Sequence, residues 1–128
     1  MTEPAWLSRR VVDAIHFDLL RTFGGAHGLR DGGAIESALA RPRNKLACES
    51  PDIHDLAAAY TFGLAKNHGY ADGNKRVALA VGGTFLHVNG VDFIVDEEQV
   101  VVVIHALCED EIDEAALANW LRENSAPR

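Results

Sequence analysis

Hydrophobic positions near the start of the chain recur with the period of a helix. Four apolar residues spaced four positions apart form one stripe: Val11, Ile15, Leu19 and Phe23. Such a stripe is typical of an amphipathic helix. Ser8 is a favourable N-cap residue, and the two glycines after Phe23 end the pattern. The spacing therefore predicts a helix from Ser8 to Phe23.

A glycine-rich segment, GGAHGLRDGG, follows and leads into a shorter apolar pattern. Asp31 can cap a helix that continues through Ile35 and Leu39 to about Arg41. Pro42 and the polar segment RNKLACESPD after it are typical of a loop. We therefore predict a short second helix followed by a second loop.

Two segments that are apolar on most faces occupy the middle of the chain. The first, IHDLAAAYTFGLAK (residues 53–66), follows Ser50 and Pro51, which suit the N-cap and the first helical position. The second, NKRVALAVGGTFLHVNG, starts near Asn74 and stops at Asn89–Gly90. We interpret both segments as buried central helices.

The last third of the chain is less regular. Residues 91–96, VDFIVD, fit a short strand or an extended connector, and four consecutive valines after them favour a strand. The acidic start and the apolar spacing of EEQVVVVIHALCED favour a helix, which we predict. A final helix is predicted from Ile112 to about Glu123, and residues 124–128 are expected to be frayed. The prediction is an all-α fold, with at most one short strand pair, in one compact domain spanning residues 1–128.

Composition adds two exclusions. The chain has 128 residues with 19 acidic and 12 basic side chains, a formal net charge of −7. Proteins that bind nucleic acid through its phosphates carry a basic surface, so direct nucleic-acid binding is not expected. No apolar run approaches signal-peptide length or the roughly 20 residues that cross a bilayer. We expect a cytoplasmic protein without membrane contact.

The candidate chemistry lies between the two central helices, in HGYADGNKR (residues 68–76). If Asn74 opens the second helix, the amides of residues 73–76 have no helical partners and lie at the positive end of the helix dipole, which favours an anion. Lys75 and Arg76 add two charges, and a guanidinium binds phosphate through two parallel hydrogen bonds. The combination indicates a polyphosphate.

An acid and a base accompany these cations. Asp72 would repel phosphates unless a cation intervened, and Mg²⁺ held by one carboxylate and by phosphate oxygens meets that need. His68 can accept a proton at neutral pH. Each residue alone is typical of an ordinary turn between helices, but their combination indicates transfer from a nucleotide to a hydroxyl.

The segment HGYADGNKR resembles the signature of the Fic/Doc family, HPFx(D/E)GN(G/K)R. The segments GLRDGGAIESALARP, LAAAYTFGLAKNH and FLHVNG resemble its Doc (death-on-curing) branch, the toxins of type II toxin–antitoxin systems. The resemblance implies a helical domain with the active-site loop between two central helices. It implies His68 as the catalytic base, Asp72 as the Mg²⁺ ligand and Arg76 as the phosphate-binding arginine. Gly73 and Asn74 correspond to the anion-hole positions.

Four positions in the motif bear on the type of reaction or depart from the signature. Tyr70 replaces the usual phenylalanine, and Gly69 replaces the usual proline. Lys75 stands where Fic-type AMP transferases have glycine. Doc toxins also have lysine at this position, and they transfer the γ-phosphate of ATP. The kinase member of the family has alanine in place of Gly73, so this chain combines the lysine of the Doc branch with a glycine that the kinase member lacks. The resemblance favours a protein kinase that phosphorylates a hydroxyl of elongation factor Tu and arrests translation.

Two other functions stay open at this point. A Fic-type AMP transferase would use the same His68, Asp72 and Arg76, and a catalytically inactive antitoxin-binding module would keep only the fold. Many Fic enzymes carry an inhibitory helix with the pattern (S/T)xxxE(G/N), which no segment here matches. The resemblance therefore implies restraint in trans by a Phd-type antitoxin, whose disordered tail would fold into a groove on the toxin.

Further polar residues lie outside this motif. The basic residues of the second predicted loop border the active site by resemblance, although a solvated loop is an equally good interpretation: Arg41, Arg43 and Lys45. His16 and His105 lie within helical segments, where we expect packing or surface roles.

Overall fold

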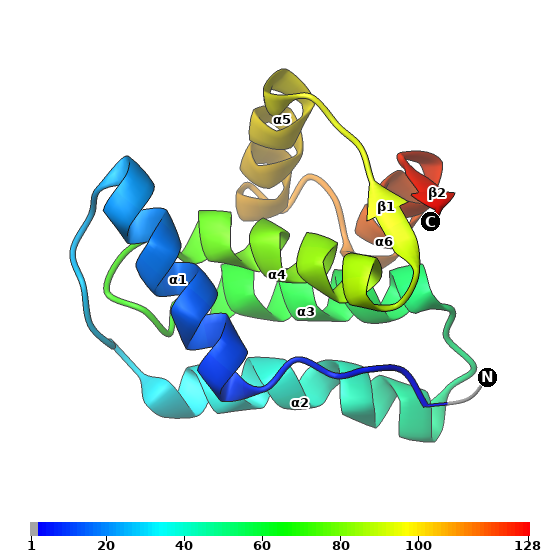
Figure 1. The fold of residues 1–128 in the computed structure, drawn as a ribbon, viewed down its shortest axis with the longest axis horizontal. Coiled ribbons are helices and arrows are strands. Elements are labelled where there is room, and N and C mark those ends of the chain that lie inside the picture. Colours follow the sequence, from blue (N-terminus) through cyan, green and yellow to red (C-terminus); the bar gives the residue numbers. More distant parts are fainter. Residues whose placement is uncertain (1–2) are drawn as a thin grey trace.

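The computed structural model describes residues 3–128, which form six helices and two short strands (Figure 1). The helices are α1 (Arg9–Phe23), α2 (Gly32–Cys48), α3 (Ile53–Asn67), α4 (Asn74–Val88), α5 (Glu97–Cys108) and α6 (Glu114–Glu123), and the strands are β1 (Val91–Phe93) and β2 (Ser125–Pro127). The predicted all-α class with a short strand pair is confirmed. Within the described residues, no helix is both long enough and apolar enough to cross a membrane.

Helix α3 is the centre of the fold and packs against α2, α4 and α6 (Figure 1). Its buried residues include a run of alanines, which let neighbouring helices approach closely. At Gly82 of α4, a Cβ atom would lie 2.2 Å from the Thr61 hydroxyl oxygen of α3, so a side chain there requires the threonine to move. The Thr61 hydroxyl donates to the Ala78 carbonyl at 2.8 Å, which satisfies a polar atom inside the core. The prediction of two buried central helices is confirmed.

Helix α2 continues through Pro42 to Cys48 instead of ending near Arg41. A proline removes one helical hydrogen bond, which is why the local pattern predicts an end here. Pro42 is nevertheless buried, and the following turns are fixed by α6, where Glu114 pairs with both Arg41 and Lys45. The predicted second loop is therefore wrong for residues 42–48, because contacts with a distant helix compensate for the proline, and only residues 49–52 connect α2 to α3.

Helix α3 begins at Ile53, after an N-cap at Asp52 rather than at Ser50. The Asp52 carboxylate accepts from the Asp55 amide at 2.8 Å, and the Asp55 carboxylate accepts from the Asp52 amide at 2.9 Å. This capping box satisfies two backbone donors at once. The predicted cap at Ser50 and Pro51 is wrong because those residues lie outside the reciprocal pair.

The carboxyl-terminal residues form a strand instead of fraying. Phe93 pairs with Ser125 in the antiparallel ladder of β1 and β2, and the Ile94 amide donates to the Asn124 carbonyl at 2.8 Å. Phe93 also meets Trp120 of α6 edge-on, with ring centroids 5.3 Å apart. These contacts hold the end of the chain against the body of the fold, so the expectation of fraying is wrong. The segment with four valines is helical, as predicted.

Helix α1 begins as predicted, with the Ser8 hydroxyl accepting from the Val11 amide at 3.2 Å. Its buried residues are Val12, His16 and Leu20. The buried face is thus displaced by one position from the apolar stripe, and Val11 and Phe23 are 41% and 53% exposed. A histidine on a buried face needs a polar partner, and the partner of His16 lies in the turn between α3 and α4.

Candidate active site

The turn between α3 and α4 starts with a backbone reversal at His68. This residue is the C-cap of α3 and has left-handed backbone angles, φ 51° and ψ 46°. Few residues other than glycine adopt this conformation. It ends α3 abruptly and leaves the His68 side chain exposed, beside the start of α4.

The predicted site residues line one pocket of about 500 Å³ between this turn and the end of α1. They are His68, Asp72, Gly73, Asn74, Lys75 and Arg76. Leu19 and Leu20 of α1 supply an apolar wall. The structure therefore brings together the whole predicted set, although the role of each residue stays a prediction.

Helix α4 differs from the other described helices at its amino terminus. Its N-cap is Gly73, with φ 78°, and no side chain bonds the first amides. The other five helices begin with side-chain caps, namely Ser8, Asp31, Asp52, Asp96 and Asp113. The uncapped amides of α4 are thus free to bind an anion in the pocket.

The side chain of Asn74 is engaged in the turn itself. Its Oδ1 accepts from the Tyr70 amide and its Nδ2 donates to the Tyr70 carbonyl, both at 3.0 Å. Asn74 can therefore contribute to an anion site through its backbone amide, while its side chain fixes the shape of the loop.

The Asp72 carboxylate is exposed and held at both oxygens. Oδ1 accepts from the Gly73 amide at 2.8 Å, and Oδ2 accepts from the Ala26 amide at 3.2 Å. Within residues 3–128, no group of three or more His, Cys, Asp or Glu side chains is arranged to hold a metal. The site fits a Mg²⁺ ion bound by one carboxylate, with its other ligands from phosphate and water.

Three cationic side chains line the pocket. The guanidinium of Arg76 lies over the Phe23 ring, 4.1 Å from its centroid, and this contact keeps the charge beside the end of α1. Lys75 is exposed next to it. The third cation, Arg30, was not anticipated, because it lies in a loop distant in sequence and carries no local motif. Three positive charges around uncapped amides suit a polyphosphate.

The loop before α2 fastens the active-site turn. The amides of Arg30 and Asp31 both donate to the Gly69 carbonyl at 2.9 Å, and the Ala71 amide donates to the Gly28 carbonyl at 3.0 Å. Gly69 is closely packed, since a Cβ there would lie 2.3 Å from Cγ1 of Ile35. Glycine at this position is therefore required by the neighbouring helix.

Tyr70 anchors the middle of the turn in the core. The side chain is buried, and its hydroxyl donates to Asp13 Oδ1 at 2.6 Å. Burial, followed by the hydrogen bond to the Asp13 carboxylate, raises the pKa of Tyr70 above its ordinary value. Tyr70 therefore stays neutral and acts as an anchor, and its hydroxyl gives it a polar partner that a phenylalanine would lack.

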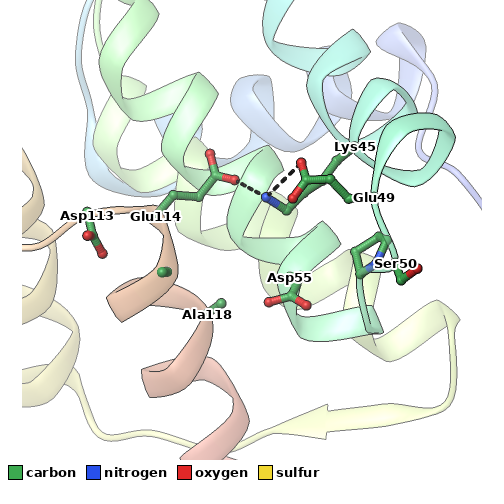
Figure 2. A pocket seen from close by; sticks show the side chains of 9 residues that line it. Lys45, Glu49, Ser50, Asp55, Asp113, Glu114 and Ala118 are labelled. Atoms are coloured by element: carbon green, nitrogen blue, oxygen red, sulfur yellow. Dashed lines mark hydrogen bonds and ion pairs between the residues drawn. The ribbon is translucent and has the colours of Figure 1, made fainter.

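The basic residues of α2 do not border this pocket. Arg43 lies over the Trp6 ring, and Arg41 pairs with Glu114. Lys45 lines a different pocket of about 460 Å³ between α2, α3 and α6, where it pairs with Glu114 and Glu49 (Figure 2). The expectation that these residues border the active site is wrong, because they belong to helix α2 and bind partners outside the pocket, which none of them lines.

The sequence is similar to one protein family and to two named proteins. The sequence model of the Fic/DOC family matches residues 6–86. The chain is 45% identical over 76 residues to a protein named Toxin Doc from Mycolicibacterium smegmatis, a match that covers 58% of each chain. It is 30% identical over 110 residues to Protein kinase doc of Escherichia phage P1, covering 85% of this chain and 86% of that protein. The matched region thus spans little more than half of the mycobacterial relative and most of the phage relative.

Proposed function

This chain belongs to the Fic/DOC family, and we propose that it is a Doc-like toxin that transfers the γ-phosphate of ATP to a protein hydroxyl. The acceptor implied by the resemblance is elongation factor Tu, whose phosphorylation would arrest translation. The observation that carries the proposal is the single pocket in which His68, Asp72 and Arg76 meet the uncapped start of α4.

The residues divide the reaction between them. The amides at the start of α4, with Arg76 and Lys75, bind and orient the phosphates. His68 accepts the proton of the acceptor hydroxyl as its oxygen forms a bond to the γ-phosphorus. The bond from that phosphorus to the bridging oxygen breaks, and ADP leaves with the charge on its β-phosphate. Positioning and charge neutralisation supply most of the catalysis.

Asp72 is the residue that would hold Mg²⁺. Its carboxylate is oriented by two backbone amides and lies beside the phosphate-binding cations. The ion, when bound, would neutralise charge between this carboxylate and the phosphates.

Two observations favour phosphate transfer over AMP transfer. Lys75 is exposed beside the start of α4, where its side chain competes for the space that a glycine would leave to the nucleotide. The relative from phage P1 is itself named a protein kinase. AMP transfer is the second candidate because the same His68, Asp72 and Arg76 could serve it.

A Phd-type antitoxin is the proposed partner. A mostly apolar groove of about 880 Å³ runs between α4, α5 and the end of α1. Its lining includes Phe23 and Val101, which are 53% and 67% exposed, and it shares Lys75 and Arg76 with the catalytic pocket. An amphipathic helix in this groove would cover apolar surface and reach the phosphate-binding side chains.

The deciding experiment uses ATP labelled at either the α- or the γ-phosphate. The purified chain and Mg²⁺ are incubated with elongation factor Tu or with a bacterial extract, and His68→Ala is the control. We expect γ-label on protein from the wild-type chain and none from His68→Ala. Transfer of α-label alone would make the chain an AMP transferase. Transfer of neither label would favour the inactive antitoxin-binding module.

A further inference from the structure

His16 is a buried histidine that the proposed reaction does not use. Its side chain is 5% exposed on the buried face of α1. Besides the tyrosines, His16 and Thr61 are the only polar residues in the core of the described chain. A polar group in such a position costs stability unless it is hydrogen-bonded.

The partner of His16 is the backbone of the proposed metal ligand. The Nε2 atom of His16 lies 2.7 Å from the carbonyl oxygen of Asp72, 56 positions away in sequence. A carbonyl oxygen can only accept, so Nε2 carries the proton and donates. This bond links the third turn of α1 directly to the residue that precedes Gly73, the N-cap of α4.

The hydrogen bond to the Asp72 carbonyl also fixes the direction of the Gly73 amide, because both groups belong to the same planar peptide unit. No peptide bond in the described chain is cis, so the Asp72 carbonyl and the Gly73 amide point in opposite directions. Holding the carbonyl toward His16 therefore directs the Gly73 amide away from α1. That amide donates to Oδ1 of the Asp72 carboxylate. The orientation of the carboxylate thus depends on the orientation of the peptide that His16 holds.

The same histidine also supports the rest of the turn. Its ring stacks on Tyr70, with centroids 3.7 Å apart and an angle of 11° between the planes. Tyr70 in turn bonds Asp13, which precedes His16 by three positions on the same face of α1. Gly73 packs against the ring, since a Cβ there would lie 3.5 Å from His16 Nε2. Helix α1 therefore holds both ends of the loop between Tyr70 and Gly73.

From these contacts we infer that His16 is the positioning residue of the active site, which orients the Asp72 carboxylate and the first amides of α4 for a Mg²⁺-bound nucleotide. The inference rests on the proposed function in naming Mg²⁺ and the nucleotide. The part that concerns the turn rests on geometry alone. His16 does not line the catalytic pocket, so it acts through the Asp72–Gly73 peptide.

Two substitutions separate the hydrogen bond of His16 from its ring. His16→Phe keeps the aromatic stack on Tyr70 and removes the donor. His16→Gln loses the ring but can place an amide N–H near the position of Nε2 and restore the bond to the Asp72 carbonyl. Both variants are first checked for a wild-type circular dichroism spectrum.

The first measurement needs no ligand and follows hydrogen exchange of the Gly73 amide by NMR. The second is calorimetric binding of a non-hydrolysable ATP analogue in the presence of Mg²⁺. We expect His16→Phe to speed the exchange and weaken binding, each by about tenfold, as for other residues that support a metal ligand. His16→Gln should stay within about threefold of wild type in both measurements.

Three results would overturn the inference. The first is a folded His16→Phe variant with wild-type exchange of the Gly73 amide and wild-type binding of the analogue. The second is a folded His16→Gln variant in which exchange and binding change as much as in His16→Phe. The third is a His16→Phe variant that is less stable but has an unchanged exchange rate at the Gly73 amide. If His16→Phe does not fold, His16→Gln decides the question by the same measurements. Failure of the wild-type chain to bind the analogue would contradict the proposed function, and the exchange of Gly73 would then decide whether His16 orients the turn.

Discussion

The side chain of Asn74 bonds both backbone polar groups of Tyr70, each at 3.0 Å. This pair closes the turn at the start of α4 and fixes the spacing between the buried Tyr70 anchor and the exposed Asp72 carboxylate. An asparagine is needed for it, because its amide offers one acceptor and one donor to the two groups at once.

Replacing Asn74 should open the turn. Asn74→Ala leaves the Tyr70 amide and carbonyl without their partners, and we expect a loss of roughly 1–3 kcal/mol in the free energy of unfolding. Asn74→Asp retains an acceptor for the amide and loses only the donor, so it should cost less. Urea unfolding of both variants measures the difference. Equal losses would show that the two hydrogen bonds do not contribute separately.

Replacing His68 should separate activity from stability. Because His68 has a left-handed conformation, His68→Gly removes backbone strain and should raise the free energy of unfolding by up to about 1 kcal/mol. The same change removes the proposed base and should lower γ-label transfer by about 10²–10⁴-fold. His68→Ala should lose transfer to the same extent without the gain in stability. Retained transfer in either variant would contradict the assignment of His68 as the base.

Adding a side chain at position 69 should disturb the packing of the turn on α2. Gly69→Ala places a Cβ atom 2.3 Å from Cγ1 of Ile35, and we expect a destabilisation of about 1–3 kcal/mol. Ile35→Ala removes the clashing atom, so the double variant should be more stable than the sum of the single changes predicts. Urea unfolding of all four proteins completes the cycle. Strict additivity would mean that the backbone moves and the contact does not decide the cost.

The stability of the chain should fall in mildly acidic solution because of His54. Burial lowers the pKa of His54 below its ordinary value of 6.5, and its buried Nε2 atom has no hydrogen-bond partner among residues 3–128. The unfolded chain therefore takes up this proton at higher pH than the folded chain does. Its contribution to stability is complete above pH 6.5 and is lost as the pH falls toward the lower, folded-state pKa.

His54→Phe should flatten this dependence. Unfolding free energies measured by urea at several pH values between about 7.5 and 5 should decline less steeply in the variant than in the wild-type chain. His27→Gln, which removes an exposed histidine of the loop before α2, is the matched control and should keep the wild-type slope. An unchanged slope in His54→Phe would assign the pH dependence to other groups.

The proposed antitoxin groove can be tested with two neighbouring valines of α5. Val101 and Val102 are 67% and 66% exposed, but only Val101 lines the groove. Val101→Asp should weaken binding of the antitoxin about tenfold or more, equivalent to about 1.4 kcal/mol, whereas Val102→Asp should leave binding unchanged. Calorimetric titration with the antitoxin measures both. Equal effects at the two positions would place the antitoxin elsewhere.

Much of the fold and of the candidate site can be predicted from short stretches of sequence. The caps at Ser8 and Asp31 and the apolar central helices involve residues a few positions apart, and such interactions depend on local spacing alone. The same holds for the motif between His68 and Arg76, since a single turn keeps its members together in any fold that has two helices around it.

The remaining features depend on partners that the chain brings together only when it folds. Helix α2 passes Pro42 because Glu114, 73 positions beyond Arg41, pairs with its side chains. The last residues form a strand because β1 supplies an edge. His16 meets Asp72 across 56 positions, and Arg30 enters the pocket from a separate loop. Hydrophobic patterns and caps do not predict such pairs, because a hydrogen bond or ion pair between distant residues forms only after packing has fixed their geometry.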